Sequence, residues 1–239
     1  MISVYTGTPG SGKSLNAARE LLRLAMLGRR IVANFAITPT KKQLKKGVAP
    51  EHWPNSKITP RDLLRYATQY HKYGKESQTT LVIDECQLIF NCRDFRANDR
   101  PEWIEFFSKH RKYGFDVILI TQHDRLLDRQ IRAFIEYEIK HRKLNRFGVP
   151  GMVLSLFRVP VFVAVTYWYG LRERCGAEFF RYRRKLGAVY DSYRDFSWVE
   201  RGGEGAGNAG GDLSRLTSKE PKNETPPPKL VIDGVPFDG

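Results

Sequence analysis

Cysteine is scarce in this 239-residue chain, and the three that occur are scattered as Cys86, Cys92 and Cys175. So few and so widely spaced, they exclude a disulfide framework and a metal site built on paired C-x-x-C motifs. The five histidines show no metal-ligand spacing, so we expect no zinc site. The pattern favours reduced thiols in a cytosolic compartment.

Long uninterrupted apolar runs are also missing. The best candidate for a membrane span, residues 149–169, has Arg158 in its middle and is broken by Pro150, Gly151 and Pro160. A spanning helix needs about 20 mostly apolar residues, so we expect buried strands here instead. The N-terminus lacks a charged segment followed by an apolar one, which argues against secretion. No repeat of 20–50 residues is visible, as a solenoid would require.

Acidic residues are fewer than basic ones. The chain has 26 Asp and Glu and 40 Lys and Arg, which give a net charge of +14 and a pI near 9.8. This excess favours a polyanionic partner such as nucleic acid or an anionic membrane, although basic residues also serve solubility. A hydrophobic content of 41% is enough for the core of one sizeable domain.

The composition changes after Trp198. Residues 199–239 are rich in glycine and proline and poor in apolar side chains, so they cannot offset the entropy of ordering. We predict a folded domain over residues 1–198 and a disordered tail over residues 199–239. Positive and negative residues nearly balance within 201–239, so the basic surface belongs to the folded domain.

Residues 7–14, GTPGSGKS, fit the phosphate-binding pattern G-x-x-x-x-G-K-[ST]. Residues 2–5 before them predict a strand, and residues 15–27 after them predict a helix whose N-terminus points at the phosphates. We expect Lys13 to reach the β and γ oxygens of a nucleotide and Ser14 to place its hydroxyl on Mg²⁺. The residues expected to contact the nucleotide are Gly7, Thr8, Pro9, Gly10, Ser11, Gly12, Lys13, Ser14 and Leu15.

Apolar strands and amphipathic helices then alternate along the first half of the chain. Residues 31–35, 79–85 and 117–122 are typical of buried parallel strands. Helices are predicted from Thr59 to Gly74 and from Asp99 to Gly114. Alternating patterns at residues 135–140 and 179–183 indicate half-exposed antiparallel strands. The fold class is therefore α/β: a P-loop NTPase of the RecA/AAA+-like kind, whose mainly parallel sheet gains antiparallel strands in the second half.

Polar residues follow two of the predicted strands. Asp84 and Glu85 end residues 81–85, as in a Walker B strand, which predicts that Asp84 holds Mg²⁺ and Glu85 activates water. Gln122 ends the following strand, where related ATPases keep a sensor of the γ-phosphate. A strand that simply reaches solvent would look the same. We predict ATP and Mg²⁺ as cofactors, Lys13, Glu85 and Gln122 as catalytic residues, and Ser14 and Asp84 as metal ligands.

Arginine is abundant in the segments that leave these strand ends, and one could act as a finger in a neighbouring subunit. The sequence does not choose among Arg93, Arg96, Arg111, Arg125, Arg129 and Arg132. Residues 110–113, 141–143 and 181–185 mix basic residues with histidine or tyrosine. That composition is typical of a surface for single-stranded nucleic acid, and equally of a solvated face.

A family resemblance is carried by the P-loop, by Asp84-Glu85 and by residues 110–114 and 118–122. In these motifs the chain resembles the zonular occludens toxin (Zot) family, over about residues 1–195. The resemblance implies an oligomeric ATPase, peripheral at the inner membrane of a bacterial host, that drives assembly and extrusion of filamentous phage. It also implies a phage coat or DNA-binding protein and an inner-membrane assembly partner. Family members usually carry a span after this domain, whereas none is predicted here.

Two alternatives from other functional classes remain open at this point. One is a DNA translocase or packaging motor that acts on single-stranded DNA, which salt-dependent binding and DNA-stimulated hydrolysis would favour. The other is a nucleotide-dependent scaffold or switch without sustained turnover, which multiple turnover of ATP would exclude.

Overall fold

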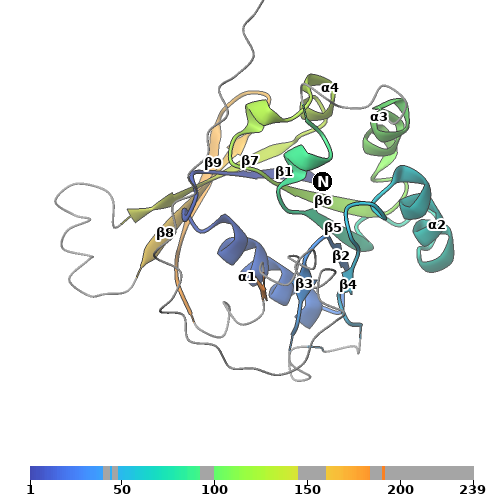
Figure 1. Cartoon of the computed structure of the whole chain (residues 1–239), viewed down its shortest axis with the longest axis horizontal. Helices are drawn as coiled ribbons and strands as arrows, with labels where there is room; N and C mark the ends of the chain where they lie inside the picture. Colours follow the sequence, from blue (N-terminus) through green and yellow to red (C-terminus); the bar gives the residue numbers. More distant parts are fainter. Residues whose placement is uncertain (40–43, 45–47, 92–99, 145–159, 184–189, 192–239) are drawn as a thin grey trace, which may run out of the picture. The chain divides into compact units, whose positions relative to one another are not determined.

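The computed structural model describes residues 1–39, 44, 48–91, 100–144, 160–183 and 190–191. Eight strands form one sheet: β1 (Ile2–Thr6), β2 (Arg30–Ala33), β4 (Glu51–His52), β5 (Thr79–Ile83), β6 (Phe115–Ile120), β7 (Tyr137–Lys143), β8 (Val161–Trp168) and β9 (Arg174–Arg181). Their order across the sheet is β4-β2-β5-β6-β1-β7-β8-β9 (Figure 1). A second, small sheet pairs β3 (Ala36–Ile37) with β10 (Tyr190–Asp191) in antiparallel fashion.

The sheet is parallel from β4 to β7 and antiparallel from β7 to β9. This confirms the predicted fold class. The alternation at residues 135–140 predicts an antiparallel strand, but β7 is antiparallel only to β8 and runs parallel to β1 on its other side. Its alternation arises because one face packs on the P-loop helix while the other carries Glu138 and Lys140, which reach a polar hollow.

The helices cover both faces of the sheet. Helix α1 (Lys13–Met26) lies on one face, and α2 (Pro60–Tyr70), α3 (Arg100–Lys109) and α4 (Arg129–Arg132) lie on the other (Figure 1). Two short 3₁₀ turns, η2 (Cys86–Leu88) and η3 (Asp124–Leu126), follow β5 and β6. The layout is a three-layer sandwich in which the sheet is the middle layer.

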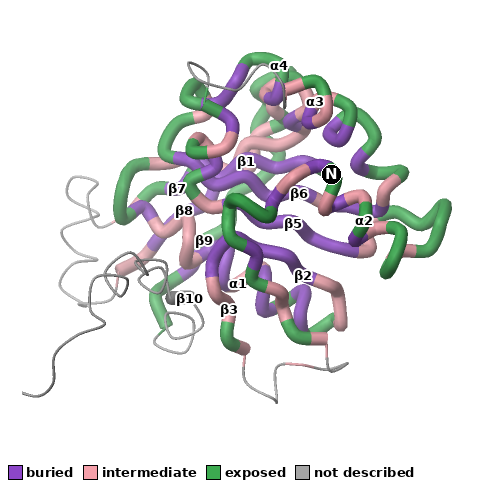
Figure 2. Tube along the Cα trace, turned by 45° about the vertical axis from the view of Figure 1, so that its right-hand side comes forward, coloured by how far each residue is buried: buried purple, intermediate pink, exposed green. Residues whose placement is uncertain are grey.

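Apolar clusters lie on both faces of the sheet. Under α1, Ala17, Leu21 and Ala25 follow a helical spacing and pack on Ile31 and Ile120 of the sheet. The opposite core is aromatic and is formed by Phe90, Trp103, Phe106, Phe107 and Phe115 together with buried strand residues. Figure 2 shows the central strands β1, β5 and β6 buried along their length, as their apolar sequences require.

Helix α2 begins as predicted but ends early. The Thr59 hydroxyl accepts a hydrogen bond from the Asp62 N–H at 3.1 Å, and Pro60 occupies the first turn. The helix stops at Tyr70 rather than near Gly74, because His71 adopts an extended backbone. Its ring bonds to the Tyr113 carbonyl and the Thr79 hydroxyl, both at 2.6 Å, which draws the chain toward the sheet.

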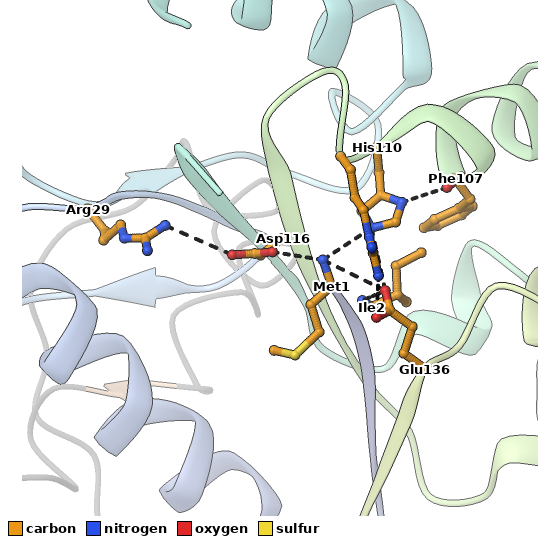
Figure 3. A network of polar contacts seen from close by, with 8 residues as sticks. Met1, Ile2, Arg29, Phe107, His110, Asp116 and Glu136 are labelled. Atoms are coloured by element: carbon orange, nitrogen blue, oxygen red, sulfur yellow. Dashed lines mark hydrogen bonds and ion pairs between the residues drawn. The ribbon is translucent and has the colours of Figure 1, made fainter. Parts of the chain in front are cut away.

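Charged groups close the edge of the sheet where β1 and β6 begin (Figure 3). The Met1 ammonium lies 2.8 Å from Asp116 and 3.2 Å from Nε2 of His110, and Glu136 pairs with Arg111 at 2.6 Å. His110 is only 6% exposed. The interpretation of residues 110–113 as a nucleic-acid surface is therefore wrong for His110, which is buried, whereas Arg111 is exposed and ion-paired, and for residues 111–113 the interpretation stays a prediction.

Within the described ranges, no helix combines the length and the apolar character that crossing a bilayer demands. Of the apolar segment 149–169, the part from Val161 to Trp168 is strand β8, as predicted for this stretch, and residues 149–159 lie outside the described residues. Residues 199–239 also lie outside them, so the disordered tail and the boundary at residue 198 stay predictions.

Candidate nucleotide-binding site

The P-loop leaves the sheet at its topological switch point. Strand β1 lies between β6 and β7, and the chain continues from β1 toward β2 on one side while β7 fills the other. Ligands of open α/β sheets bind outside the carboxyl ends of the strands at such a point. The Gly7 N–H donates to the Gln122 carbonyl at 3.2 Å, so the loop begins directly beside the end of β6.

Two glycines of the loop are required by their surroundings. Gly7 and Gly12 have φ angles of 143° and 93°. A Cβ at Gly7 would lie 2.5 Å from the His141 carbonyl oxygen, and one at Gly12 would lie 2.7 Å from the Phe162 ring. Strands β7 and β8 thus press on the loop from one side, and only glycine fits there.

The loop offers donors suited to an anion. The Ser11 hydroxyl is buried and has no hydrogen-bond partner in the described part of the chain. Helix α1 starts at Lys13, after the N-cap residue Gly12, with no side-chain cap and no acidic residue in its first turn, so its first N–H groups have no competing carboxylate. Lys13 Nζ donates to the Gly7 carbonyl at 2.7 Å and so lies across the mouth of the loop. These groups fit a polyphosphate.

Two carboxylates act on Lys13 from the end of strand β5. Burial lowers the pKa of Lys13, and the charges of Glu85 and Asp84 oppose that shift. The Glu85 N–H donates to Asp84 Oδ1 at 2.8 Å, and the Gln87 amide donates to Glu85 Oε2 at 2.5 Å. Strand β5 ends at Ile83, so both carboxylates lie in the turn after it rather than in the strand. Glu85 has the left-handed φ of 47°.

Asn34, just after β2, holds this turn and was not identified from the sequence. Its Oδ1 accepts from the Asp84 N–H at 2.7 Å, and its Nδ2 donates to the Asp84 carbonyl at 2.8 Å. The amide thereby clamps the backbone of the carboxylate turn to the neighbouring strand. The position of Asn34 directly after a buried strand is a signal that could have identified it, because Asp84 and Gln122 were identified by the same pattern.

A metal ion at this site would have oxygen ligands. Among the described residues, no group of three or more His, Cys, Asp or Glu could hold a metal. A hydroxyl from Ser14 and a carboxylate from Asp84 suit Mg²⁺, which binds proteins through few side chains and keeps water and phosphate oxygens. The donor set therefore fits Mg²⁺ held together with a nucleotide.

Of the other predicted residues, Gln122 lies beside Gly7 with an exposed side chain, and its sensor role stays a prediction. The candidate finger arginines lie in different parts of the fold. Arg111 lies at the opposite edge of the sheet, paired with Glu136, while Arg125 and Arg132 line a hollow beside the P-loop. Arg93 and Arg96 lie outside the described residues, as do residues 184 and 185 of the basic segment 181–185.

His141 braces the P-loop from β7. The Arg19 guanidinium donates to Asn16 Oδ1 at 2.8 Å, which fixes the Asn16 amide so that its Nδ2 donates to His141 Nε2 at 2.9 Å. The other ring nitrogen, Nδ1, then donates to the Thr6 carbonyl at 3.2 Å. Arg19 is itself held by Glu178 of β9. The interpretation of residues 141–143 as a nucleic-acid surface is thus wrong for His141, which is buried among polar partners.

Because the His141 ring is buried, we expect the stability of the fold to be sensitive to acid. Burial lowers its pKa from 6.5 to about 4, so the folded chain keeps it neutral while the unfolded chain takes up a proton near pH 6.5. This contribution to stability is complete above pH 6.5 and is lost as pH falls toward 4. We expect the free energy of unfolding, from urea titrations, to fall by about 2 kcal/mol between pH 7 and pH 5 through this group.

The variant His141→Gln should lose that part of the pH dependence, whereas exposed His52→Gln should keep it. Burial also lowers the pKa of His110 and His71, so some acid sensitivity remains in every variant. NMR titration of the unsubstituted chain gives an independent check. A His141 midpoint near 6.5 would contradict the buried neutral ring.

The parallel sheet, the switch point and the loop between β1 and α1 define the fold of the P-loop NTPases. A solved ATPase domain shares this fold, with a TM-score of 0.52 at 10% identity over 78% of this chain and 82% of that chain. The chain belongs to the zonular occludens toxin (Zot) family, whose model matches residues 1–195. The predicted family resemblance is thereby confirmed.

Relatives include the Gene 1 protein of Escherichia phage If1, which is 27% identical over 210 residues, 82% of this chain and 59% of the relative. The N-terminal domain of zonular occludens toxin from Neisseria meningitidis has a TM-score of 0.46 at 19% identity, covering 80% of this chain and 98% of that chain. The chain spans about half the length of the Gene 1 proteins it matches, 46–59%.

Proposed function

We propose that this chain is a Mg²⁺-dependent ATPase that drives the assembly and extrusion of filamentous phage through the host cell envelope. The observation that carries the hydrolytic part is that the charges of Glu85 and Asp84 act on Lys13, beside a buried Ser11 hydroxyl without a hydrogen-bond partner among the described residues. The phage role is supported by membership of the Zot family and by similarity to Gene 1 proteins of filamentous phages.

In the proposed reaction the loop N–H groups, the Ser11 hydroxyl and Lys13 hold the β and γ phosphates. Lys13 leaves its contact with the Gly7 carbonyl and turns to the γ-phosphate, where its charge offsets the charge of the transition state. Mg²⁺, held by Ser14 and Asp84, would supply further positive charge to the phosphate oxygens. Glu85 accepts a proton from the attacking water, and Gln122 contacts the γ-phosphate.

We further propose that the chain works as a homo-oligomer held at the inner face of the host membrane by a partner. A phage coat or DNA-binding protein would be its cargo. Membership of the family supports these statements. In the described residues, β9 is an edge strand whose side chains are mostly exposed, so the sheet keeps one flank open to another chain.

The test is the release of inorganic phosphate from ATP, measured over many turnovers with Mg²⁺ and again after chelation of the metal. We expect sustained hydrolysis that stops without Mg²⁺, together with a solution mass above that of one chain. A single burst equal to the protein concentration would instead indicate a nucleotide switch. Release of phage particles, compared between host cells with and without the gene for this chain, then tests the phage role separately from hydrolysis.

A further inference from the structure

A hollow of about 890 Å³ runs along β7, from the P-loop to the turn between β8 and β9. We call it the basic hollow. Its walls are Thr6 at the end of β1, residues 7 and 8 of the P-loop, the segment 122–125 after β6, helix α4, strand β7 and the turn between β8 and β9. Side chains alternate along β7. His141 faces α1, so Glu138, Lys140 and Arg142 project to the other face, into the hollow.

Positive charge dominates its lining. The cationic side chains are Arg125, Arg132, Lys140, Arg142 and Arg172. The two carboxylates that also line it are already engaged. Asp124 accepts from the Tyr169 hydroxyl at 3.0 Å, and Glu138 accepts from the Thr6 hydroxyl at 2.8 Å and pairs with Lys140 at 3.3 Å. The remaining field in the hollow attracts anions.

Two of these arginines are available to a ligand. Arg125 and Arg172 are exposed, and within the described ranges neither side chain forms an ion pair or a hydrogen bond. A third, Arg132, has a buried Nε without a hydrogen-bond partner in the same ranges. Guanidinium groups present several donors in a fixed plane, which matches phosphate oxygens.

An aromatic ring lies among the cations. Tyr167 pairs with Glu138 across β7 and β8, so its ring lies on the face that lines the hollow. The Lys140 ammonium lies 5.1 Å from the centroid of the Tyr167 ring. Trp168 pairs with Tyr137 instead, and its indole lies near the Tyr137 ring on the face that also holds His141. A tyrosine ring beside cations provides a face for stacking a nucleobase together with charges for its phosphates. An acidic polypeptide would use the charges but would gain little from the ring.

We propose that the basic hollow binds single-stranded DNA, with phosphates on Arg125 and Arg172 and a base stacked on Tyr167. The strand would touch Thr6 and Gly7, where the P-loop begins, and would lie next to Gln122. An effect of bound DNA on ATP hydrolysis rests on the proposed function, whereas binding itself does not. The site adds a direct DNA contact to an ATPase proposed only to move protein-coated DNA.

The first experiment measures binding of a fluorescent 20-nucleotide oligo(dT) to the full chain by anisotropy, without nucleotide and at several salt concentrations. Arg125→Gln/Arg172→Gln should weaken binding about tenfold or more. It should also make the slope of log K against log salt concentration less negative by about 1.4, since each phosphate contact on a single strand contributes about 0.7 to that slope.

The matched control is Lys72→Gln/Lys112→Gln, which removes the same charge from exposed positions between elements at the opposite edge of the sheet. It should change affinity less than about threefold. Equal losses in both double variants would show that net charge alone attracts the DNA and would overturn the site.

The second experiment separates stacking from charge. Tyr167→Ala should weaken oligo(dT) binding about fivefold or more, and Tyr167→Phe should recover most of the loss, because an aromatic face remains. Unchanged binding in Tyr167→Ala, with poly-glutamate competing as well as oligo(dT) at equal charge, would assign the hollow to an acidic polypeptide and overturn the proposal. Equal thermal midpoints establish that the variants are folded.

ATP turnover of the unsubstituted chain, measured alongside, tells the two proposals apart. Specific oligo(dT) binding without sustained hydrolysis would refute the proposed function and support the DNA site. Sustained hydrolysis by the unsubstituted chain, with no loss of DNA binding in Arg125→Gln/Arg172→Gln, would support the proposed function and refute the DNA site.

Discussion

Replacing Lys13 with alanine should reduce ATP hydrolysis at least 100-fold and weaken ATP binding. The ammonium is half-buried at the mouth of the P-loop, and burial already lowers its pKa, so its charge acts in a poorly solvated setting. Removing one preorganised donor to a transition-state charge costs about 10²–10³ in rate where it has been measured. Phosphate release under saturating Mg²⁺ and ATP measures the loss, and a fluorescent ATP analogue reports binding.

The fold should survive this change. In the described residues Lys13 bonds only to the carbonyls of Gly7 and Thr8, at 2.7 and 3.4 Å, and removing a partly desolvated ammonium relieves a cost. We therefore expect a thermal midpoint equal to or above that of the unsubstituted chain. Full ATPase activity in a folded Lys13→Ala chain would refute the assignment of the site.

Exchanging Glu85 for glutamine should leave ATP binding intact and lower turnover about 10²–10⁴-fold, the contribution typical of a general base. Glutamine keeps the size of the side chain and an oxygen to accept the hydrogen bond from the Gln87 amide. It removes only the capacity to take a proton from water. Single-turnover and steady-state assays with the same fluorescent binding measurement separate the two steps.

A suitable control is Glu76→Gln, which removes one negative charge from an exposed position before β5. It should hydrolyse ATP at the normal rate. If Glu85→Gln retained normal turnover, or lost nucleotide binding, the water-activating carboxylate would have to be sought elsewhere.

Local patterns in the sequence predicted several of the central elements and drew attention to the polar residues after β5 and β6. The P-loop pattern, the Thr59-Pro60 start of α2 and the apolar runs of β5 and β6 all report on neighbours within a few residues, and each was found. The parallel order of the strands also brings the turn after β5 into electrostatic contact with Lys13.

What could not be predicted depends on contacts between distant residues. Asn16 and His141 are 125 positions apart, and Asn34 and Asp84 are 50 apart, so nothing in the local pattern links them. Phe162 reads as an ordinary strand residue, yet its ring is what leaves room only for glycine at position 12. The interpretation of His110 and His141 as parts of a nucleic-acid surface was wrong for the same reason, since their burial and charge depend on surroundings that only the fold supplies.

The backbone at Glu85 has a consequence for how the chain can change over evolution. A left-handed φ of 47° is unfavourable for a side chain with a Cβ, by about 1 kcal/mol or more, and glycine would adopt it without strain. Selection for stability alone would therefore drive this position toward glycine. With the proposed role of Glu85 in activating water, folding and chemistry compete at this position, and replacement of the carboxylate by glycine would make the chain more stable and inactive.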